Sequence, residues 1–275
     1  MKKVIIAFDG NHFSKGAFAF AEKLNQSQKI LLVGAFLPQV NFASMTNYPG
    51  GGMDGPWLAP VIESDDTAVI EQCIGIFTEA CRKSQIEYRV HEDFHDFSLA
   101  ELKKESRFAD LMIIGSEAFY ENIGIHEPNI YLQEALHDIE CPAVVVPENF
   151  NFPENNILAY DGSESSVFAI KQFAYLFPEL ASNNTILVFA KSKEVEELPD
   201  QDYIEELAAR HFTNLTLEGL QLDPVKFFDS WLLENQKAIL ISGAFGRSDI
   251  SRLIRKSFII EMLKDHRMPV FIAHK

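Results

Sequence analysis

Short apolar runs alternate with longer segments of helical period along the whole chain. Each run is rich in Val, Ile, Leu or Phe, which is typical of buried β-strands. In the segments between them, apolar residues recur every three or four positions, which indicates helices that bury one face. The predicted strands are 4–8, 29–36, 87–94, 110–115, 143–147, 157–160, 185–190, 215–220, 238–242 and 270–273. Strands that alternate with helices favour right-handed crossovers and a mostly parallel sheet covered on both faces.

The order of these elements occurs twice along the chain. Each copy opens with an apolar run, an Asp-Gly pair and apolar residues of helical period, so that Asp9 matches Asp161 and Ser14 matches Ser166. The matched segments are 2–21 with 155–174, 110–119 with 238–247, and 141–148 with 268–275. Because such self-similarity marks a repeated structural unit, the chain is expected to contain two copies of one unit.

A linker separates the two copies. Residues 147–156 (PENFNFPENN) are rich in Pro and Asn and lack an apolar period. We therefore predict two tandem doubly wound, Rossmann-like α/β domains, 1–149 and 154–275, each with a five-stranded, mostly parallel sheet and helices on both faces. Only the first copy contains a long Gly- and Pro-rich segment, 37–60. That segment predicts an irregular loop near the ligand edge, either a lid or a plain insertion.

Composition narrows the classes of function. The chain has 275 residues, 47% hydrophobic and 23% charged, as in ordinary globular proteins. Its formal net charge of -16 argues against nucleic acid or an anionic membrane as the main partner, since both require a cationic surface. No apolar run approaches the roughly 20 residues that span a bilayer, and the N-terminus lacks a signal-peptide pattern. We expect a cytoplasmic protein.

Cysteines and histidines give little support for metal or redox chemistry. Cys73, Cys81 and Cys141 form no metal-type pair, and free Cys usually behaves as a small buried hydrophobe. His91 and His95 form the only close histidine pair and would share one face of a strand. That pair is interpreted either as a metal site or as solvated edge histidines, and the residues alone leave both open.

The Asp-Gly pairs are the first candidate site. Asp9 and Asp161 each end a first strand and precede a glycine and a helix. A carboxylate there can accept hydrogen bonds from an amino group or a sugar hydroxyl, as in nucleotide-binding α/β folds. Alternatively, the aspartate bonds its own backbone and only makes the turn.

A glycine-led basic loop, residues 243–258, is the second candidate. Gly243 and Gly246 follow a strand, where the missing Cβ atoms let backbone N–H groups approach an anion. Ser257 is a plausible N-cap of the next helix, whose start attracts phosphate. Arg247 and Lys256 could add direct charge. The alternative is that these charges are simply solvated.

The matched stretch of the first copy has the opposite charge. Residues 115–130 contain three Glu and no Lys or Arg, whereas 243–258 contain three Arg and one Lys against a single Asp. A purely structural loop has no reason to reverse its sign. The comparison favours an anion site that is retained in the second copy and lost in the first.

Each half resembles the universal stress protein family, within the adenine nucleotide alpha hydrolase-like folds, and the resemblance covers essentially the whole chain. In that family a first-strand Asp recognises adenosine, and a loop of pattern G-x-x-G-x(9)-G-[ST] wraps the phosphates of ATP. The second copy matches with Gly243, Gly246 and Ser257, while Lys256 replaces the third glycine. The first copy retains Gly115 but has Ala118, Pro128 and Asn129 at the other positions.

The resemblance implies one nucleotide site, in the second domain, for ATP or a related adenine nucleotide with Mg²⁺. It implies regulation in a stress response and no catalysis beyond slow ATP hydrolysis. It also implies an intramolecular pseudo-dimer through the last strand of each half, and a homodimer is a further expectation. The residues it assigns to the nucleotide are Ala159, Asp161, Gly243, Gly246, Arg247, Lys256, Ser257 and Phe258.

Two alternatives remain. In the first, both sites have decayed and the tandem is a nucleotide-free scaffold for other proteins. In the second, the protein is an adenylyl-transferring enzyme, a class that generally carries an H-x-G-H or S-G-G-x-D-S signature; neither occurs in this sequence.

Overall fold

A computed structural model describes most of the chain. The described residues are 1–37, 64–92, 98–117, 119, 130–190, 197–220, 237–243, 263 and 266–274. They form an α/β fold with a mostly parallel sheet, which confirms the predicted fold class. The predicted loop 37–60 lies outside these residues from position 38 onward.

The strands follow the apolar runs closely, with differences of one or two residues at their ends. They are β1 (Lys2–Phe8), β2 (Ile30–Phe36), β3 (Glu87–Glu92), β4 (Leu111–Gly115), β5 (Ala143–Val146), β6 (Asn155–Ala159), β7 (Asn184–Ala190), β8 (Asn214–Leu220), β9 (Ala238–Ser242) and β10 (Val270–Ile272). The helices are α1 (Lys15–Ser27), α2 (Ser64–Lys83), α3 (Ser98–Arg107), α4 (Ile130–Asp138), α5 (Glu164–Leu176) and α6 (Gln201–His211), with a short 3₁₀ turn, η3 (Leu180–Ser182).

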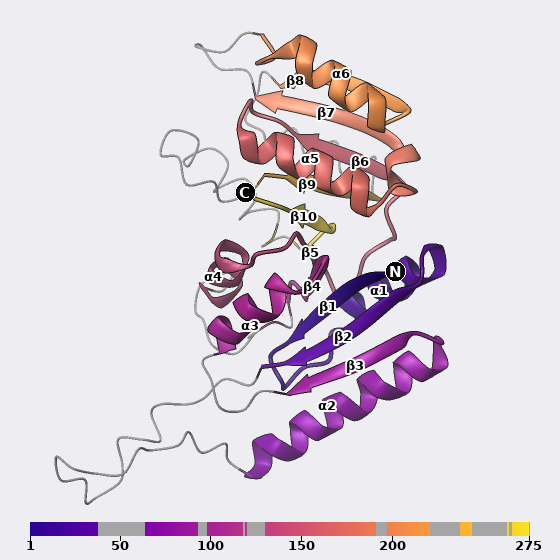
Figure 1. Cartoon of the computed structure of the whole chain (residues 1–275), viewed down its shortest axis with the longest axis vertical. Helices are drawn as coiled ribbons and strands as arrows, with labels where there is room; N and C mark the ends of the chain where they lie inside the picture. Colours follow the sequence, from indigo (N-terminus) through magenta and orange to yellow (C-terminus); the bar gives the residue numbers. More distant parts are fainter. Residues whose placement is uncertain are drawn as a thin grey trace, which may run out of the picture.

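All strands belong to one 10-stranded sheet of order β3-β2-β1-β4-β5-β10-β9-β6-β7-β8 (Figure 1). Within each half the strands are parallel and have the same doubly wound order. The halves join where β5 pairs antiparallel with β10, with Val144 opposite Phe271. The resemblance implied this pairing of the two last strands, and both would otherwise leave an apolar edge exposed. The limits of the two domains stay a prediction.

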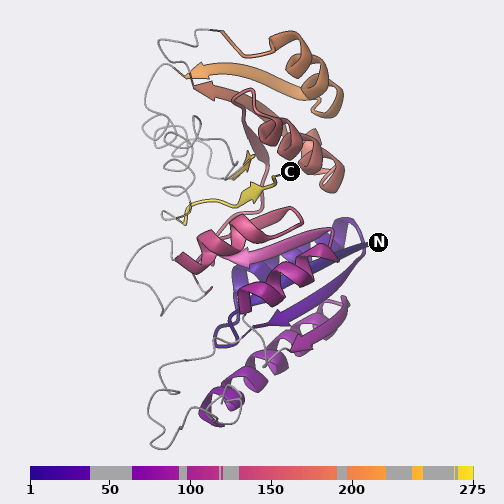
Figure 2. The ribbon, with the colours of Figure 1, turned by 60° about the vertical axis from the view of Figure 1, so that its left-hand side comes forward.

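The sheet buries apolar side chains on both faces. One cluster lies under α1, α2, α5 and α6 and is continuous between the halves. Within it the ring centroids of Phe20 and Phe177 lie 6.1 Å apart, and those of Phe173 and Phe271 lie 5.4 Å apart. The other cluster lies on the opposite face of the sheet and also includes residues of both halves; α3 and α4 cover it in the first half (Figure 2). No described helix is long and apolar enough to cross a membrane.

Candidate functional site

The ends of β6 and β9 lie side by side in the sheet. Ala159, the last residue of β6, is the register partner of Ser242, the last residue of β9. Asp161 and Gly243 therefore begin two neighbouring loops at the carboxyl edge of the sheet. The strand order reverses between β6 and β9, and open α/β sheets bind ligands at such a switch point.

The Asp161 carboxylate shapes the turn into α5. Its Oδ1 accepts hydrogen bonds from the backbone N–H of Ser163 at 3.1 Å and from the Ser163 hydroxyl at 2.8 Å. Gly162 has φ of +80°, a conformation that glycine adopts readily. Ser163 in turn caps α5 by accepting from the backbone N–H of Ser166 at 3.2 Å. The turn-making role that the sequence left open for this aspartate is present.

Gly243 packs against the first turn of α5. A Cβ atom on Gly243 would lie 2.1 Å from the carbonyl carbon of Ser165 and 2.3 Å from the nitrogen of Ser166. No side chain fits there, so the glycine lets the chain after β9 pass directly over the helix start. This contact gives Gly243 a packing role in addition to the anion approach predicted from the sequence.

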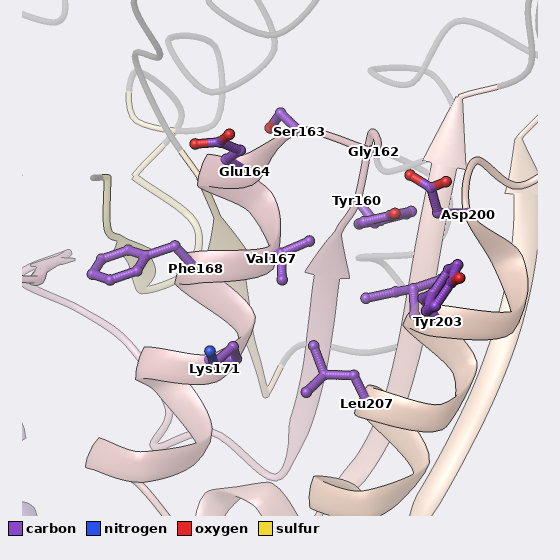
Figure 3. A pocket seen from close by; sticks show the side chains of 11 residues that line it. Tyr160, Gly162, Ser163, Glu164, Val167, Phe168, Lys171, Asp200, Tyr203 and Leu207 are labelled. Atoms are coloured by element: carbon purple, nitrogen blue, oxygen red, sulfur yellow. The ribbon is translucent and has the colours of Figure 1, made fainter.

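A pocket of about 740 Å³ opens between α5 and α6, beside the Asp161 turn (Figure 3). Tyr160 forms part of its lining, and its hydroxyl donates to the carbonyl of Pro199 at 3.0 Å. Burial, with a smaller effect of the Asp200 carboxylate, raises the pKa of Tyr160. This pocket was not predicted from the sequence, where the available signal was a tyrosine at the end of an apolar run and directly before an Asp-Gly pair. The other lining residues are Gly162, Ser163, Glu164, Val167, Phe168, Lys171, Asp200, Tyr203, Ile204 and Leu207.

The first-half turn uses its aspartate in a different way. Asp9 is 3% exposed, and its Oδ1 accepts from the backbone N–H groups of Asn11 and His12, each at 2.9 Å. The His12 ring nitrogen Nδ1 lies 2.9 Å from Asp9 Oδ2. The imidazole thus lies against the second oxygen of this carboxylate. This turn is closed by the residues of its own loop.

A second carboxylate occupies the start of α1. Glu148, in the chain after β5, accepts hydrogen bonds from the backbone N–H groups of Lys15 at 2.9 Å and Gly16 at 3.2 Å, and from the Ser14 hydroxyl. A Cβ atom on Gly16 would lie 2.1 Å from the carbonyl oxygen of Pro147, so only glycine lets this chain pass. A carboxylate is stabilised at a helix N-terminus by the free N–H groups and the helix dipole. An internal anion thus fills the position where an external one would bind.

Neighbouring polar groups extend this contact to the second half. Glu117 Oε2 accepts from the backbone N–H of Glu148 at 2.9 Å and from the Ser116 hydroxyl at 2.7 Å. His266, which precedes β10, places Nδ1 2.8 Å from the Ser116 hydroxyl oxygen and 3.9 Å from Glu117 Oε2. The acidic stretch of the first copy therefore includes residues with defined partners.

Solved structures with the same architecture identify the fold. A universal stress protein from Archaeoglobus fulgidus superimposes with a TM-score of 0.68 at 12% identity, covering 100% of this chain and 96% of that chain. The chain has the fold of the universal stress proteins. A putative universal stress protein from Pseudomonas aeruginosa UCBPP-PA14 matches with a TM-score of 0.55 at 12% identity, covering 100% of this chain and 93% of that chain.

A functionally unknown protein from Pseudomonas aeruginosa PAO1 shares the universal stress protein fold of this chain as well. It matches with a TM-score of 0.55 at 11% identity, covering 100% of this chain and 92% of that chain. No family model matches the sequence, and no curated protein matches it. The likeness is therefore one of structure, recognised in the sequence through the repeated Asp-Gly and glycine-loop motifs.

The structure describes only part of the nucleotide site that the universal stress protein resemblance predicts. Ala159, Asp161 and Gly243 lie together at the edge described above. The remaining predicted residues, Gly246, Arg247, Lys256, Ser257 and Phe258, lie outside the described residues.

His91 and the three cysteines have ordinary structural surroundings in this universal stress protein fold. His91 Nδ1 lies 2.5 Å from Glu105 Oε1, and its partner His95 is outside the described residues. Among the described residues, no group of three or more His, Cys, Asp and Glu side chains could hold a metal ion. Cys73, Cys81 and Cys141 are buried free thiols, as predicted.

Proposed function

We propose that the protein binds ATP or another adenine nucleotide at the edge of its second half and acts as a regulator in a stress response. The observation that carries the proposal is the pairing of Ala159 with Ser242, which brings Asp161 and Gly243 to one switch point. The two sequence candidates, separated along the chain, thus start from neighbouring strand ends. Asp161 would face the adenosine and the loop after Gly243 would face the phosphates.

Charge supports a phosphate at this edge. The loop that Gly243 opens contains Arg247 and Lys256, and Ser257 begins the predicted last helix. Phosphate groups bind well where a helix start supplies N–H donors and basic side chains supply charge. Mg²⁺ would accompany the phosphates. Because no nucleophile or general base is predicted in the loop, we propose binding with at most slow hydrolysis.

Features of the first half support a single nucleotide site per chain, located in the second half. There the α1 start already holds the Glu148 carboxylate. In the matched segments 141–148 and 268–275, the residue aligned with Glu148 is Lys275, which has the opposite charge. A carboxylate excludes an external anion and an ammonium attracts one. We therefore propose a stoichiometry of one nucleotide per chain, bound by the second half.

A nucleotide-free scaffold is the second candidate, and two observations favour it. Asp161 already bonds Ser163, and Gly243 is already required for packing against α5. Both residues thus have a structural reason to be present without any ligand. The same experiment separates the two functions.

The test is calorimetric titration of the full-length protein with Mg-ATP, together with mass spectrometry of small molecules released on denaturation. The Arg247→Glu, Ser257→Ala double variant should lose binding, while the control Arg82→Glu, at the end of α2, should retain it. Titration should end at one nucleotide per chain. Absence of both released nucleotide and binding heat for the unaltered protein would reject nucleotide binding and leave the scaffold.

A further inference from the structure

The pocket between α5 and α6 is a groove with apolar walls and three charged lining residues: Glu164 and Asp200 near its upper end and Lys171 lower on α5 (Figure 3). Val167 of α5 and Leu207 of α6 face each other across it, and Tyr160 lies between the helices. Asp200 lies at the upper end near Tyr160, and Lys171 lies lower on α5, at the level of Leu207. Its volume of about 740 Å³ is within the range of small-molecule sites.

The acidic end of the groove has an unusual backbone. Asp200 is the N-cap residue of α6, yet its side chain makes no capping hydrogen bond, and its φ of +47° is in the left-handed region. N-cap aspartates normally accept from the helix N–H groups with an extended backbone. Its carboxylate lines the upper end of the groove (Figure 3) and lies close enough to Tyr160 to contribute to the raised pKa of that phenol. Strained residues of this kind occur often at binding sites.

The basic end also has an unused charge. Among the residues that the structure describes, the Lys171 ammonium forms neither a hydrogen bond nor an ion pair, although it lines the pocket beside apolar side chains. A lysine commonly extends into water when it has no partner. Lys171 and Asp200 thus form a basic and an acidic pole of the groove, with the apolar side chains of Val167 and Leu207 between them.

The length of the groove along α6 limits the size of a ligand, because Asp200 and Leu207 both line it. Asp200 and Leu207 are seven residues apart, which is about 10 Å along α6. Tyr160, only 4% exposed, forms a buried part of the groove wall and is held in place by its hydrogen bond to Pro199. Tyr203, 78% exposed, adds a second aromatic ring at the mouth. Aromatic rings pack well against such surfaces in offset or edge-on contacts.

We propose that this groove binds a small aromatic molecule that carries an amino group at one end and a carboxylate at the other. The amine pairs with Asp200, the carboxylate pairs with Lys171, and the ring packs along Val167 and Leu207 beside Tyr160. Gly162 and Ser163 of the Asp161 turn line one end of the groove, but the rest of it extends along α5 and α6, away from the edge between β6 and β9, so we propose a separate site. Binding here does not depend on the proposed nucleotide function.

The experiment uses three matched probes on the full-length protein, titrated by saturation-transfer NMR and calorimetry. The zwitterion 4-(aminomethyl)phenylacetate should bind about tenfold more tightly than 4-methylphenylacetate, which lacks the amine, and 4-methylbenzylamine, which lacks the acid. Each lost charge-assisted hydrogen bond has about that effect on affinity. Equal binding of all three probes, or binding of none, would overturn the proposal.

Variants then assign each pole. Lys171→Met should lower the affinity for the zwitterion about tenfold and leave that for 4-methylbenzylamine unchanged, because only the carboxylate contact is lost. Asp200→Asn keeps a residue type that tolerates the left-handed backbone. It should lower the affinity for the zwitterion about tenfold and leave that for 4-methylphenylacetate unchanged, because only the amine contact is lost. Lys83→Met on α2 is the matched control and should change neither affinity. Thermal melting verifies that each variant is folded.

Competition with Mg-ATP separates the groove from the nucleotide edge. The zwitterion should bind with the same affinity at saturating Mg-ATP as without it. Displacement of the probe by the nucleotide would mean that the groove is part of the nucleotide site, and the proposed separate site would be wrong. If Mg-ATP does not bind at all, the probe titrations still decide this proposal by themselves.

Discussion

Glu148 accepts a hydrogen bond from the backbone N–H of Lys15 at 2.9 Å, across 133 residues of sequence. The contact ties the chain that follows β5 to the start of α1, beside the end of β4. It gives the first half its own anion, where the second half has Lys275 at the aligned position. The two copies therefore share a strand order and differ in the charge of the residue at this aligned sequence position.

Removal of this carboxylate should destabilise the protein. Glu148→Ala takes away a helix-start acceptor and its interaction with the helix dipole, and we expect the free energy of unfolding to fall by about 1–2 kcal/mol. The control is Glu154→Ala, whose exposed ion pair with Lys237 should contribute less than about 1 kcal/mol. Urea denaturation followed by circular dichroism measures both. Equal small losses in the two variants would show that the Glu148 contact contributes nothing special.

Gly243 and Gly75 should respond in opposite directions to alanine. Gly243→Ala places Cβ against the Ser165 and Ser166 backbone, so it should destabilise by about 3 kcal/mol or more, at the upper end of overpacking effects, and should also weaken nucleotide binding. Gly75 lies within α2, and a Cβ atom added there would meet nothing within 4 Å, so Gly75→Ala should stabilise by about 0.5–1 kcal/mol. Thermal and urea unfolding of both variants test this. A stable Gly243→Ala protein would contradict the close packing.

The thiols should be unreactive in the folded protein. Burial raises the pKa of Cys81 and of Cys141 to about 12, and burial also raises the pKa of Cys73. The thiolate is the reactive form, so a disulfide reagent at pH 8 should label these three cysteines only after urea is added. Rapid labelling without urea would contradict the burial of these side chains.

The same thiols predict a loss of stability at high pH. A thiol whose pKa is higher in the folded state ionises first in the unfolded chain, so its contribution is intact below the ordinary thiol pKa of 9.0 and declines as pH rises from there toward about 12. Urea midpoints measured between pH 8 and pH 11 should therefore decrease. Replacing Cys81 by Ala should make the urea midpoint fall less steeply with pH. An unchanged dependence on pH would show that this thiol does not contribute to it.

The two halves should unfold together. The Phe20 ring of the first half meets Phe177 of the second at 6.1 Å, and Phe177 meets Phe271 of β10 at 5.9 Å. Phe177→Ala should cost about 3–5 kcal/mol, whereas Phe108→Ala, at a side chain 66% exposed, should change stability by about 0.5 kcal/mol or less. Calorimetry and circular dichroism should give one coincident transition. Two separate transitions in the unaltered protein would contradict a shared core.

Much of the fold could be predicted from the sequence, because the strands and the repeat depend on local patterns of apolar residues. Apolar runs such as 4–8 and 238–242 are buried on both faces of a parallel sheet, and the repeat of Asp9 in Asp161 revealed two copies. The pairing of β5 with β10 could also be predicted, because two apolar edge strands need cover.

Other features depended on contacts between residues far apart in sequence. No local pattern connects Glu148 with Lys15, Tyr160 with Pro199, or Gly243 with Ser165, because each contact forms only when strands and helices are packed together. The sequence by itself determined the repeated α/β units, the charge reversal between 115–130 and 243–258, and the buried thiols. Only the tertiary structure decided that a linker carboxylate occupies the first helix start and that a two-poled groove lies between α5 and α6, since helix ends and grooves acquire their partners through packing.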